Sequence, residues 1–292
     1  MVYSRAMAQT HQPPSKATVA PAPSAARPPP APQPRGNAAA QSQTRHNDLN
    51  TATPGSEASR RPLPDLRALE AKGYRVTPAA GMDVLYSAAK DSPDKPLAQQ
   101  PVGKGGYDVV SSGTYTVDYV HSAGPVMRDG KLDTQGHEKS AGRGGVAVLE
   151  DGSIVVGRGK GRDAASIQSQ FAKKDSKVKD FMGGGALLIE NGRKVDSADL
   201  REQQRFDQGK GGLDAQQMRS THHVLVGIRD GQAFHILAKA RTGRQIQDDL
   251  AASGFDSVVK FDGGSGGYFR EGAGAASHAG KNTTGLGVRA RR

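Results

Sequence analysis

Cysteine is absent from the chain of 292 residues. Without it there are no disulfides, no thiolate metal ligands and no cysteine nucleophile. The absence does not identify the compartment, because a cysteine-free chain persists in reducing and oxidising surroundings alike. No apolar run approaches the length of a membrane span, and the first residues, MVYSRAMAQTHQPPS, lack the apolar stretch of a Sec-type signal peptide.

A strong charge imbalance is missing from the middle of the chain, although the net charge is +11. Lys and Arg outnumber Asp and Glu by 7 to 2 in residues 1–61 and by 4 to none in residues 273–292, but only by 29 to 27 in residues 62–272. A basic tail can lie on nucleic acid or on an anionic membrane, and a solvated tail is the simpler interpretation. No dense Lys/Arg cluster with interleaved aromatic residues occurs, so the sequence predicts no dedicated nucleic-acid surface.

The composition divides the chain into four parts. Residues 1–61 contain 10 of the 17 prolines and a single aromatic residue, so they are predicted to be a disordered leader. Residues 62–104 are predicted to be a linker with one short helix, in which VLYSAA is either a strand or a further helical turn. Residues 105–272 form the predicted domain, and residues 273–292, rich in Gly, Ala and Arg, are predicted to be a basic flexible tail.

The leader carries the stretch APAPSAARPPPAPQP. This composition is typical of a polyproline spacer, and equally of a segment that threads in an unfolded state during delivery. Together with the missing Sec signal, it resembles the unfolded leaders of bacterial type III effectors. The expected location is therefore the bacterial cytoplasm, or the destination of a non-Sec secretion route such as type III delivery into a host cell.

From Tyr107 onward, short apolar runs alternate with Gly, Asp and Asn turns. Four junctions, RDGK, EDGS, ENGR and RDGQ, carry the Asp-Gly or Asn-Gly pair that is typical of β-hairpins. The folded body is therefore predicted to be strand-rich with a few helices, in the α+β class. Helices are expected over PDLRALEAKGY, capped by Asp65 and ended at Gly73, over DAASIQSQFAKK, starting at Asp163, and over TGRQIQDDLAASGF, from the N-cap Thr242 to Gly254.

Residues 258–269, VVKFDGGSGGYF, run an apolar strand into an aspartate and then into four glycines within five positions. Alternation along the strand places Asp262 and Lys260 on one face. A nearby ammonium favours the ionised carboxylate, which suits a nucleophile, a ligand-orienting group or a metal ligand. The glycines leave backbone N–H groups uncovered for a phosphate oxygen. The alternative is a tight turn capped by the aspartate side chain.

Two further stretches draw attention. Gly183, Gly184 and Gly185 precede the apolar run ALLIE, which suggests close backbone approach, and no Lys-Ser/Thr follows them, so they are not a Walker A loop. His222 and His223 open HHVLVGI, and neighbours on a strand point to opposite faces. They therefore do not form a metal pair, and one core and one surface histidine is the simplest expectation.

In this order, the elements resemble the phosphodiester glycosidase domain family over about residues 105–270. The similar stretches are GPVMRDGK, GGGALLIENGR, VGIRDG, and the helix TGRQIQDDLAASGF followed by DSVVKFDGGSGG. The chain departs from the family's usual pattern at four places. Ser112-Gly113-Thr114-Tyr115 stands where Asn-Gly precedes an aromatic pair, His223 stands where an arginine is usual, Lys260 replaces an asparagine, and Ser265 replaces a glycine.

The resemblance implies a hydrolase that breaks the bond between the anomeric carbon of a sugar and a phosphate oxygen. It implies catalytic roles for His223 and for Asp262, whose carboxylate would stabilise an oxocarbenium-like state. Backbone amides and cationic side chains would hold the phosphate. The expected substrate-binding residues are Gly183, Gly184, Gly185, Gly263, Gly264, Tyr115, Arg219, Arg241 and Lys260.

Two functions stay open on the sequence. The first is a hydrolase of glycosyl phosphodiesters, nucleotide-sugar-like substrates included, and the retained Asp262-Gly263-Gly264 favours it. The second is a non-catalytic module that binds a sugar phosphate or polysaccharide, and the changes at His223 and Lys260 favour that. In either case the partner is a small-molecule or glycan phosphodiester. No cofactor is identified, a divalent metal beside Asp262 stays open, and the sugar, the aglycone and the oligomeric state are not determined.

Overall fold

The computed structural model describes residues 49–60, 65–87, 96–114, 122–140, 142–202, 213–214, 222–263, 269–272 and 283–291. Most of the predicted leader therefore lies outside the described residues. Residues 46–292 belong to one compact unit. None of the helices in the described ranges is long and apolar enough to cross a membrane.

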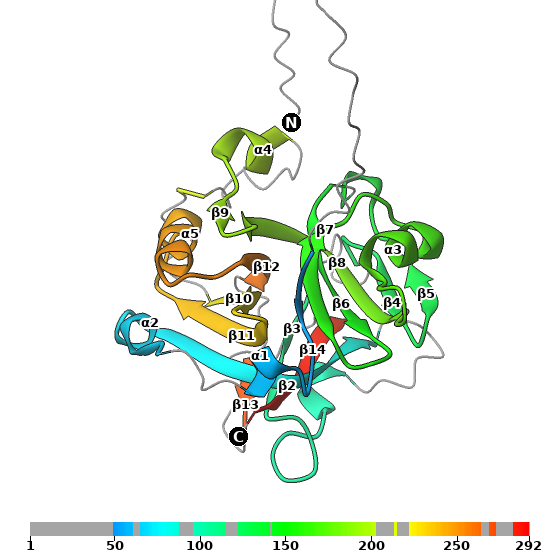
Figure 1. The fold of residues 1–292 in the computed structure, drawn as a ribbon, viewed down its shortest axis with the longest axis horizontal. Helices are drawn as coiled ribbons and strands as arrows, with labels where there is room; N and C mark the ends of the chain where they lie inside the picture. The colour runs from blue at the N-terminus through cyan, green and yellow to red at the C-terminus, as the bar shows by residue number, and fades with distance from the viewer. Residues whose placement is uncertain are drawn as a thin grey trace, which may run out of the picture. The chain divides into compact units, whose positions relative to one another are not determined.

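One large sheet forms the centre of this unit (Figure 1), and its strand pairs are antiparallel. Short hairpins build it, because each Asp-Gly or Asn-Gly turn returns the chain beside the strand that it has just left. This arrangement, with a few helices outside the sheet, confirms the strand-rich α+β prediction. In spatial order the strands are β1 (Asn50–Ala52), β7 (Ile154–Arg158), β6 (Gly144–Leu149), β8 (Val178–Glu190), β12 (Ser257–Gly263), β10 (His222–Arg229), β11 (Gln232–Lys239), β2 (Tyr74–Tyr86), β14 (Thr284–Ala290), β3 (Val109–Ser112) and β13 (Phe269–Glu271), with β4 (Val126–Arg128), β5 (Lys131–Thr134) and β9 (Arg193–Lys194) beside β8.

The four predicted hairpin turns are confirmed, and three of them share one backbone form. Asp129, Asn191 and Asp230 all have positive φ, as does the glycine that follows each, which is the conformation that two-residue hairpins require. The turn between β6 and β7 differs. There only Gly152 has positive φ, and the Asp151 side chain accepts the backbone N–H of Ser153 at 2.8 Å. This is the longer hairpin geometry, with a type I turn followed by a left-handed glycine.

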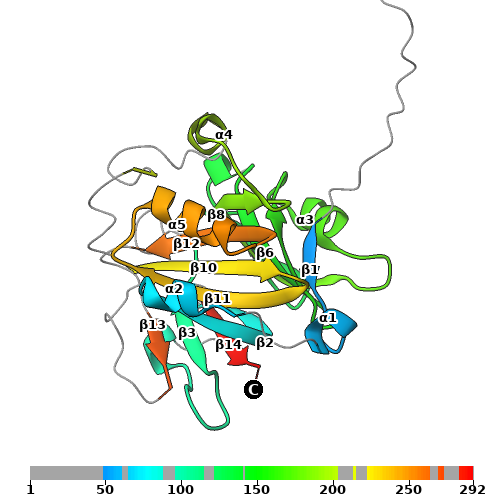
Figure 2. The same cartoon turned by 60° about the vertical axis from the view of Figure 1, so that its left-hand side comes forward.

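The helices lie outside the sheet, and two are confirmed with their predicted caps. The Asp163 side chain accepts the backbone N–H of Ser166, and Thr242 forms a capping box with Gln245. Figure 2 shows α5 lying along β12 and β10. The bounds are α1 (Glu57–Arg60), α2 (Arg67–Ala71), α3 (Ala164–Phe171), α4 (Ser197–Glu202) and α5 (Gly243–Ala252), with 3-10 turns η1 (Leu97–Gln99) and η2 (Glu138–Ser140).

The predicted cap of α2 was one residue off. Leu66 is the N-cap residue, and no side chain caps it. Asp65 instead accepts the backbone N–H of Arg67 at 3.0 Å and pairs with its guanidinium. The predicted end of the helix is correct, because Gly73 follows the C-cap with φ +86°, a conformation that favours glycine.

Three predicted boundaries were wrong. Residues 62–104 are not only a linker, since they contain β2, which pairs with β11 on one side and β14 on the other. The tail 273–292 is not entirely flexible, since it contains β14, inserted between β2 and β3. The predicted leader also extends too far, because its last residues form β1 and α1. The folded domain therefore recruits strands from both sides of residues 105–272.

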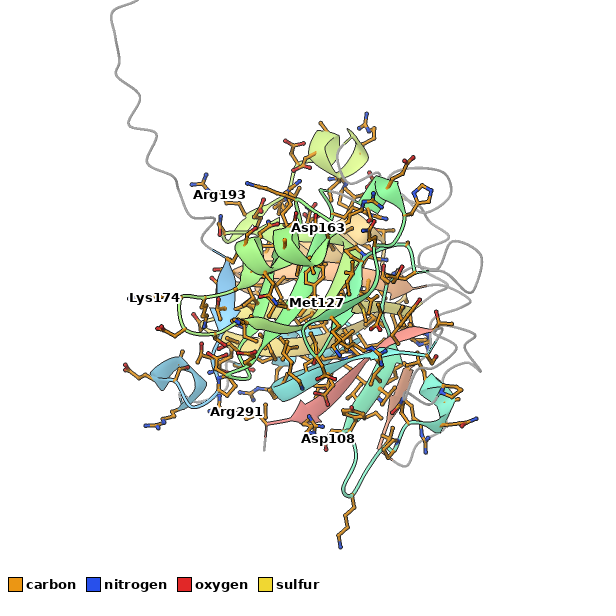
Figure 3. All side chains as sticks on the ribbon, turned by 90° about the vertical axis from the view of Figure 1, so that its right-hand side faces the viewer. Asp108, Met127, Asp163, Lys174, Arg193 and Arg291 are labelled. Carbon is orange, nitrogen blue, oxygen red and sulfur yellow. The ribbon has the colours of Figure 1, made fainter. Side chains whose placement is uncertain are left out.

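The apolar residues form one main core inside the sheet and a second cluster under α3. In the second cluster the Phe171 ring of α3 lies 4.9 Å from the Phe181 ring of β8. Figure 3 shows the face that carries this helix, with Asp163 at its start and Met127 labelled among the strands. Met127 is fully buried in this cluster. The helix and the strands therefore bury their apolar faces against each other.

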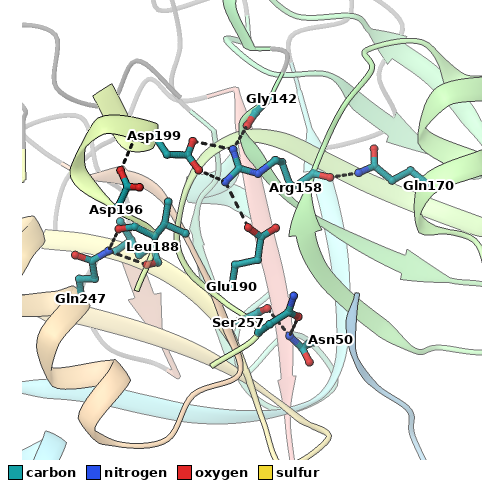
Figure 4. A network of polar contacts seen from close by, with 12 residues as sticks. Asn50, Gly142, Arg158, Gln170, Leu188, Glu190, Asp196, Asp199, Gln247 and Ser257 are labelled. Carbon is teal, nitrogen blue, oxygen red and sulfur yellow. Dashed lines mark hydrogen bonds and ion pairs between the residues drawn. The ribbon is translucent and has the colours of Figure 1, made fainter. Parts of the chain in front are cut away.

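A charged network fastens α4 to the sheet (Figure 4). Arg158, at the end of β7, donates to both carboxylate oxygens of Asp199 in α4, at 2.9 and 2.6 Å. Its guanidinium also lies 3.4 Å from the Glu190 carboxylate at the end of β8. The Arg158 side chain is only 15% exposed, and its two parallel bonds match the geometry of a carboxylate. This pair should therefore be stronger than an ion pair in open solvent.

Arg158→Lys is expected to lower the free energy of unfolding by about 1–2 kcal/mol, because an ammonium keeps the charge but cannot make both bonds to Asp199. Urea denaturation of the full chain measures the loss. Arg193→Lys is the matched control, since Arg193 is exposed and projects from the rim of the molecule in Figure 3. Equal stability of Arg158→Lys and the wild type would show that the network does not hold α4.

Candidate active site

Consecutive glycines in β8 let neighbouring segments approach this strand closely. A Cβ atom on Gly184, whose φ is +88°, would lie 2.7 Å from Thr114 Oγ1 and 2.8 Å from the Cα atom of Gly124. A Cβ atom on Gly185 would lie 2.9 Å from the carbonyl oxygen of Lys260. Real Cβ atoms do not approach backbone this closely, so these positions require glycine. The structure thus confirms the close approach that the sequence suggested here.

The last residues of β12 lie against this glycine-rich stretch. Lys260 pairs with Ala186, the residue directly after the glycines. Its side chain is 1% exposed, and Nζ donates to the carbonyl oxygen of Phe261 at 2.9 Å. An ammonium in such a place needs acceptors or negative charge around it. The carbonyl oxygen of Phe261 is one such acceptor.

The first residues of β10 lie on the other side of β12. His223 pairs with Gly263, at the point where a register shift interrupts the ladder. The imidazole is fully buried, and its Nε2 atom lies 3.1 Å from the carbonyl oxygen of Arg241. His222 is partly exposed, so the expectation of one core and one surface histidine is confirmed. A buried imidazole thus lies beside β12, the strand that carries Asp262, and a buried ammonium lies within that strand.

Arg241 lies in the short connection between β11 and α5. Its guanidinium donates to the carbonyl oxygen of Lys72, from Nε at 3.2 Å and from Nη2 at 2.6 Å, and it lies 6.0 Å from the centre of the Tyr74 ring. The first backbone amides of α5 already have protein acceptors, which are the Gln245 side chain, the Leu213 carbonyl and the Thr242 hydroxyl. The guanidinium and the helix start thus serve local contacts.

Thr114 is a polar residue of this region that is not among the predicted site residues. It follows β3 and is fully buried, and its Oγ1 atom has no hydrogen-bond partner within the described parts of the chain. Its backbone carbonyl accepts the Thr284 hydroxyl at 3.0 Å, which ties the start of β14 to the end of β3. The available signal was the stretch Ser112-Gly113-Thr114, where small residues follow an apolar strand. A buried hydroxyl without a partner is unusual and marks a candidate functional position.

Most of the predicted site residues that lie within the described ranges are found at one end of the sheet. Gly185 of β8 contacts the end of β12, and His223 lies beside that end in β10. For Asp262 and Gly263 the backbone is described within β12. Gly264, Tyr115 and Arg219 lie outside the described residues.

Other features of the described ranges lie apart from this end. No group of three His, Asp or Glu side chains in those ranges could hold a metal ion. A cavity of about 180 Å³ lies beside the turn between β10 and β11, at the opposite end of these two strands, and Gly231, Ala233 and Arg291 contribute to its wall. None of the predicted site residues lines it.

The chain belongs to the phosphodiester glycosidase family, whose model matches residues 104–281, more than half of the sequence. No curated protein matches the chain. Among solved structures it is similar to the zebrafish N-acetylglucosamine-1-phosphodiester α-N-acetylglucosaminidase catalytic domain auto-inhibited by its pro-peptide, with a TM-score of 0.50 and 12% identity over 83% of this chain and 88% of that chain. It is also similar to a hypothetical protein from Synechocystis, with a TM-score of 0.43 and 13% identity over 75% of this chain and 59% of that chain.

The family match confirms the resemblance, and with it hydrolysis of a glycosyl phosphodiester as the activity that the family suggests. The zebrafish domain shares the fold with this chain. That likeness covers 83% of the chain, more than the span of the family match, so it includes residues outside 104–281. This agrees with the placement of β2 and β14 in the sheet.

Proposed function

We propose that the protein hydrolyses a glycosyl phosphodiester at the bond between the anomeric carbon and the phosphate oxygen. A water oxygen bonds to the anomeric carbon, the carbon–oxygen bond to phosphate breaks, and its electron pair leaves on the phosphate. The products are the free sugar and a phosphomonoester. Because phosphate is a weak base, its departure depends less on a strong general acid than on groups that hold its charge.

The close contact between Gly185 and the Lys260 carbonyl is the observation that carries this proposal. It joins the two most family-like stretches of the sequence, GGGALLIENGR and SVVKFDGG, at one end of the sheet. In the proposed site the Asp262 carboxylate stabilises positive charge that develops on the anomeric carbon. The ammonium of Lys260 and the backbone amides of the glycines hold the phosphate. His223 exchanges the proton of the attacking water.

Asp262→Asn is expected to reduce sugar release at least about 100-fold, because the amide has the shape of the carboxylate but not its charge. The full-length protein is incubated with a panel of glycosyl phosphodiesters that includes nucleotide sugars. NMR follows the free sugar and the new phosphomonoester. Asp230→Asn is the matched control. Asp230 lies in an exposed hairpin turn, and asparagine adopts the positive φ of this position as readily as aspartate does.

The outcomes separate the two functions that the sequence leaves open. No release by folded wild-type protein across the panel, together with saturable binding of one of its members, would replace the hydrolase with a binding module. Release that Asp262→Asn leaves intact would remove Asp262 from the reaction. A parallel assay with a chelator tests the divalent metal proposed beside Asp262, and loss of activity that added metal restores would support it.

A further inference from the structure

The carbonyl oxygen of Arg241 determines which nitrogen of His223 carries hydrogen. It lies 3.1 Å from Nε2 of the fully buried ring. A carbonyl oxygen only accepts hydrogen bonds, so Nε2 must be the donor in this contact. In the neutral imidazole the lone pair then belongs to Nδ1, and Nδ1 is the nitrogen that gains or loses a proton.

The Arg241 side chain holds this carbonyl in place. The residue before it, Ala240, has φ +58°, an uncommon conformation for a residue with a side chain, so the connection between β11 and α5 needs local support. The guanidinium gives that support through its two hydrogen bonds to the Lys72 carbonyl and its position over the Tyr74 ring. The residue after it, Thr242, is fixed by the capping box of α5.

Lys72, whose carbonyl oxygen accepts the two hydrogen bonds from Arg241, is itself held in place. Lys72 is the C-cap residue of α2, where carbonyl groups lack helical partners and a cation is favoured. Its ammonium pairs with Asp249 of α5 at 2.5 Å, and the Tyr74 hydroxyl donates to the same carboxylate at 2.9 Å. Burial and this hydrogen bond raise the pKa of Tyr74 above its ordinary value, so the phenol keeps its proton and stays a donor. A closed set of contacts thus links α2, Arg241 and α5.

We infer that Arg241 is a positioning residue for His223. Its side chain fixes the 240–242 connection on the end of α2, and its carbonyl holds the imidazole as the Nε2–H tautomer, which directs proton exchange to Nδ1. The assignment of the tautomer rests on the geometry alone. Its use in catalysis rests on the proposed function, in which Nδ1 takes a proton from the water whose oxygen bonds to the anomeric carbon while the electron pair of the broken bond leaves on the phosphate.

The test is ¹⁵N NMR of the histidine rings in the full-length protein, with the His223 signals identified by their loss in His223→Gln. The wild type is expected to show one His223 tautomer, with hydrogen on Nε2 and a bare Nδ1. Arg241→Met removes every donor of the side chain and is expected to give a mixture of both tautomers and a loss of kcat of about 10- to 100-fold. Arg241→Lys, which keeps one donor for the Lys72 carbonyl, is expected to restore part of each.

Arg244→Met is the matched control, because Arg244 lies three residues after Arg241, in the first turn of α5, and pairs with Asp214 and Ser197 rather than with the Lys72 carbonyl. It should keep the wild-type tautomer. A bare Nε2 in the wild type, or an unchanged single tautomer in folded Arg241→Met, would overturn the inference. If Arg241→Met does not fold, Arg241→Lys replaces it in the test, and an unchanged single tautomer in that variant would overturn the inference. Absence of sugar release by the wild type would reject the proposed function, while the NMR result would still decide the role of Arg241.

Discussion

Replacing Gly184 with alanine is expected to lower the free energy of unfolding by about 2–5 kcal/mol and to abolish sugar release. Two costs combine. A left-handed backbone at φ +88° costs an alanine about 1–2 kcal/mol. The new methyl group would also lie 2.8 Å from the Cα atom of Gly124 and 2.7 Å from Thr114 Oγ1, and overpacking of this kind costs about 1–3 kcal/mol more.

Gly192→Ala separates these two costs. Gly192 has a similar φ of +71°, but a Cβ atom there would meet nothing within 4 Å. This variant should therefore lose only the conformational part, about 1–2 kcal/mol, and should keep its activity. The difference between the two variants measures the close approach of β8 to Gly124 and Thr114.

Urea unfolding at neutral pH gives both stabilities, and the NMR assay gives the activities. The methyl group at Gly184 must displace the backbone of Gly124 and the side chain of Thr114, so the damage falls on the candidate site itself. If Gly184→Ala lost no more stability than Gly192→Ala, the packing described for β8 would be wrong. If it lost stability but kept full activity, the glycine-rich strand would be structural only.

The elements that the sequence predicted correctly depend on local chemistry. An Asp-Gly or Asn-Gly pair selects its turn within four residues, and all four such pairs form hairpins. Asp163 and Thr242 cap their helices by bonds to residues three positions later. Signals of this kind need no knowledge of the rest of the fold.

The strands that the sequence missed depend on distant partners. β14, with the sequence TGLGVRA, has few of the β-branched and aromatic residues typical of strands. Its glycines instead allow close packing, since a Cβ atom on Gly285 would lie 2.6 Å from the Ser111 carbonyl oxygen and one on Gly287 would lie 2.5 Å from the Tyr107 ring. The strand exists because β2 and β3 lie on either side of it. A glycine-rich composition therefore resembled a tail until its neighbours were known.

Only the end of β2, within VLYSAA, was an open candidate for a strand; Pro78 disfavours the rest, since proline usually excludes a central strand. The carbonyl oxygen of Pro78 accepts the backbone N–H of Arg291, just beyond the last β14 residue paired with β2. The N–H and C=O groups of a strand residue face the same neighbour, so the missing N–H of Pro78 falls where the ladder with β14 ends. The proline costs the sheet no regular hydrogen bond, and no local signal reveals this.

In the candidate site, too, the sequence predicted the features that depend on local residues and missed those that depend on distant ones. The glycine clusters at Gly183–Gly185 and after Asp262 could be recognised in the sequence, because glycine weakens a strand and often marks a close approach of the backbone. Thr114 and the contact of Arg241 with Lys72 were not, because each depends on a segment far away in sequence. The close packing of the glycine-rich strand was therefore predictable, and its supporting contacts were not.

The stability of the protein is expected to fall by about 3 kcal/mol between pH 7 and pH 4 through His235 alone. This residue of β11 is buried, and its Nε2 atom lies 2.9 Å from the Ser111 hydroxyl of β3. Its ring stacks on Phe269 with centres 6.1 Å apart. Burial lowers the pKa of His235 from 6.5 to about 4. The folded state therefore resists a proton that the unfolded state accepts.

The sign follows from the two pKa values. Above pH 6.5 both states hold a neutral ring, and the full stability is present. As the pH falls from 6.5 to about 4 the unfolded state binds the proton first, so stability is lost; below about 4 both states are protonated, and this loss is complete. At about 1.4 kcal/mol per pKa unit, the shift corresponds to the expected 3 kcal/mol.

His235→Gln isolates this contribution, because its amide can still bond to Ser111 Oγ but does not titrate between pH 4 and pH 7. Urea unfolding of both proteins is measured at several pH values across this range. The carboxylates contribute equally to both, so the difference in stability between the wild type and His235→Gln should shift by about 3 kcal/mol in favour of the variant as the pH falls. His137→Gln removes an exposed histidine and should follow the wild type. If the stabilities of the wild type and His235→Gln showed the same pH dependence, the ring would accept a proton inside the fold. Its second nitrogen would then need a hydrogen-bond acceptor of its own, in addition to the Ser111 hydroxyl that joins β3 to β11.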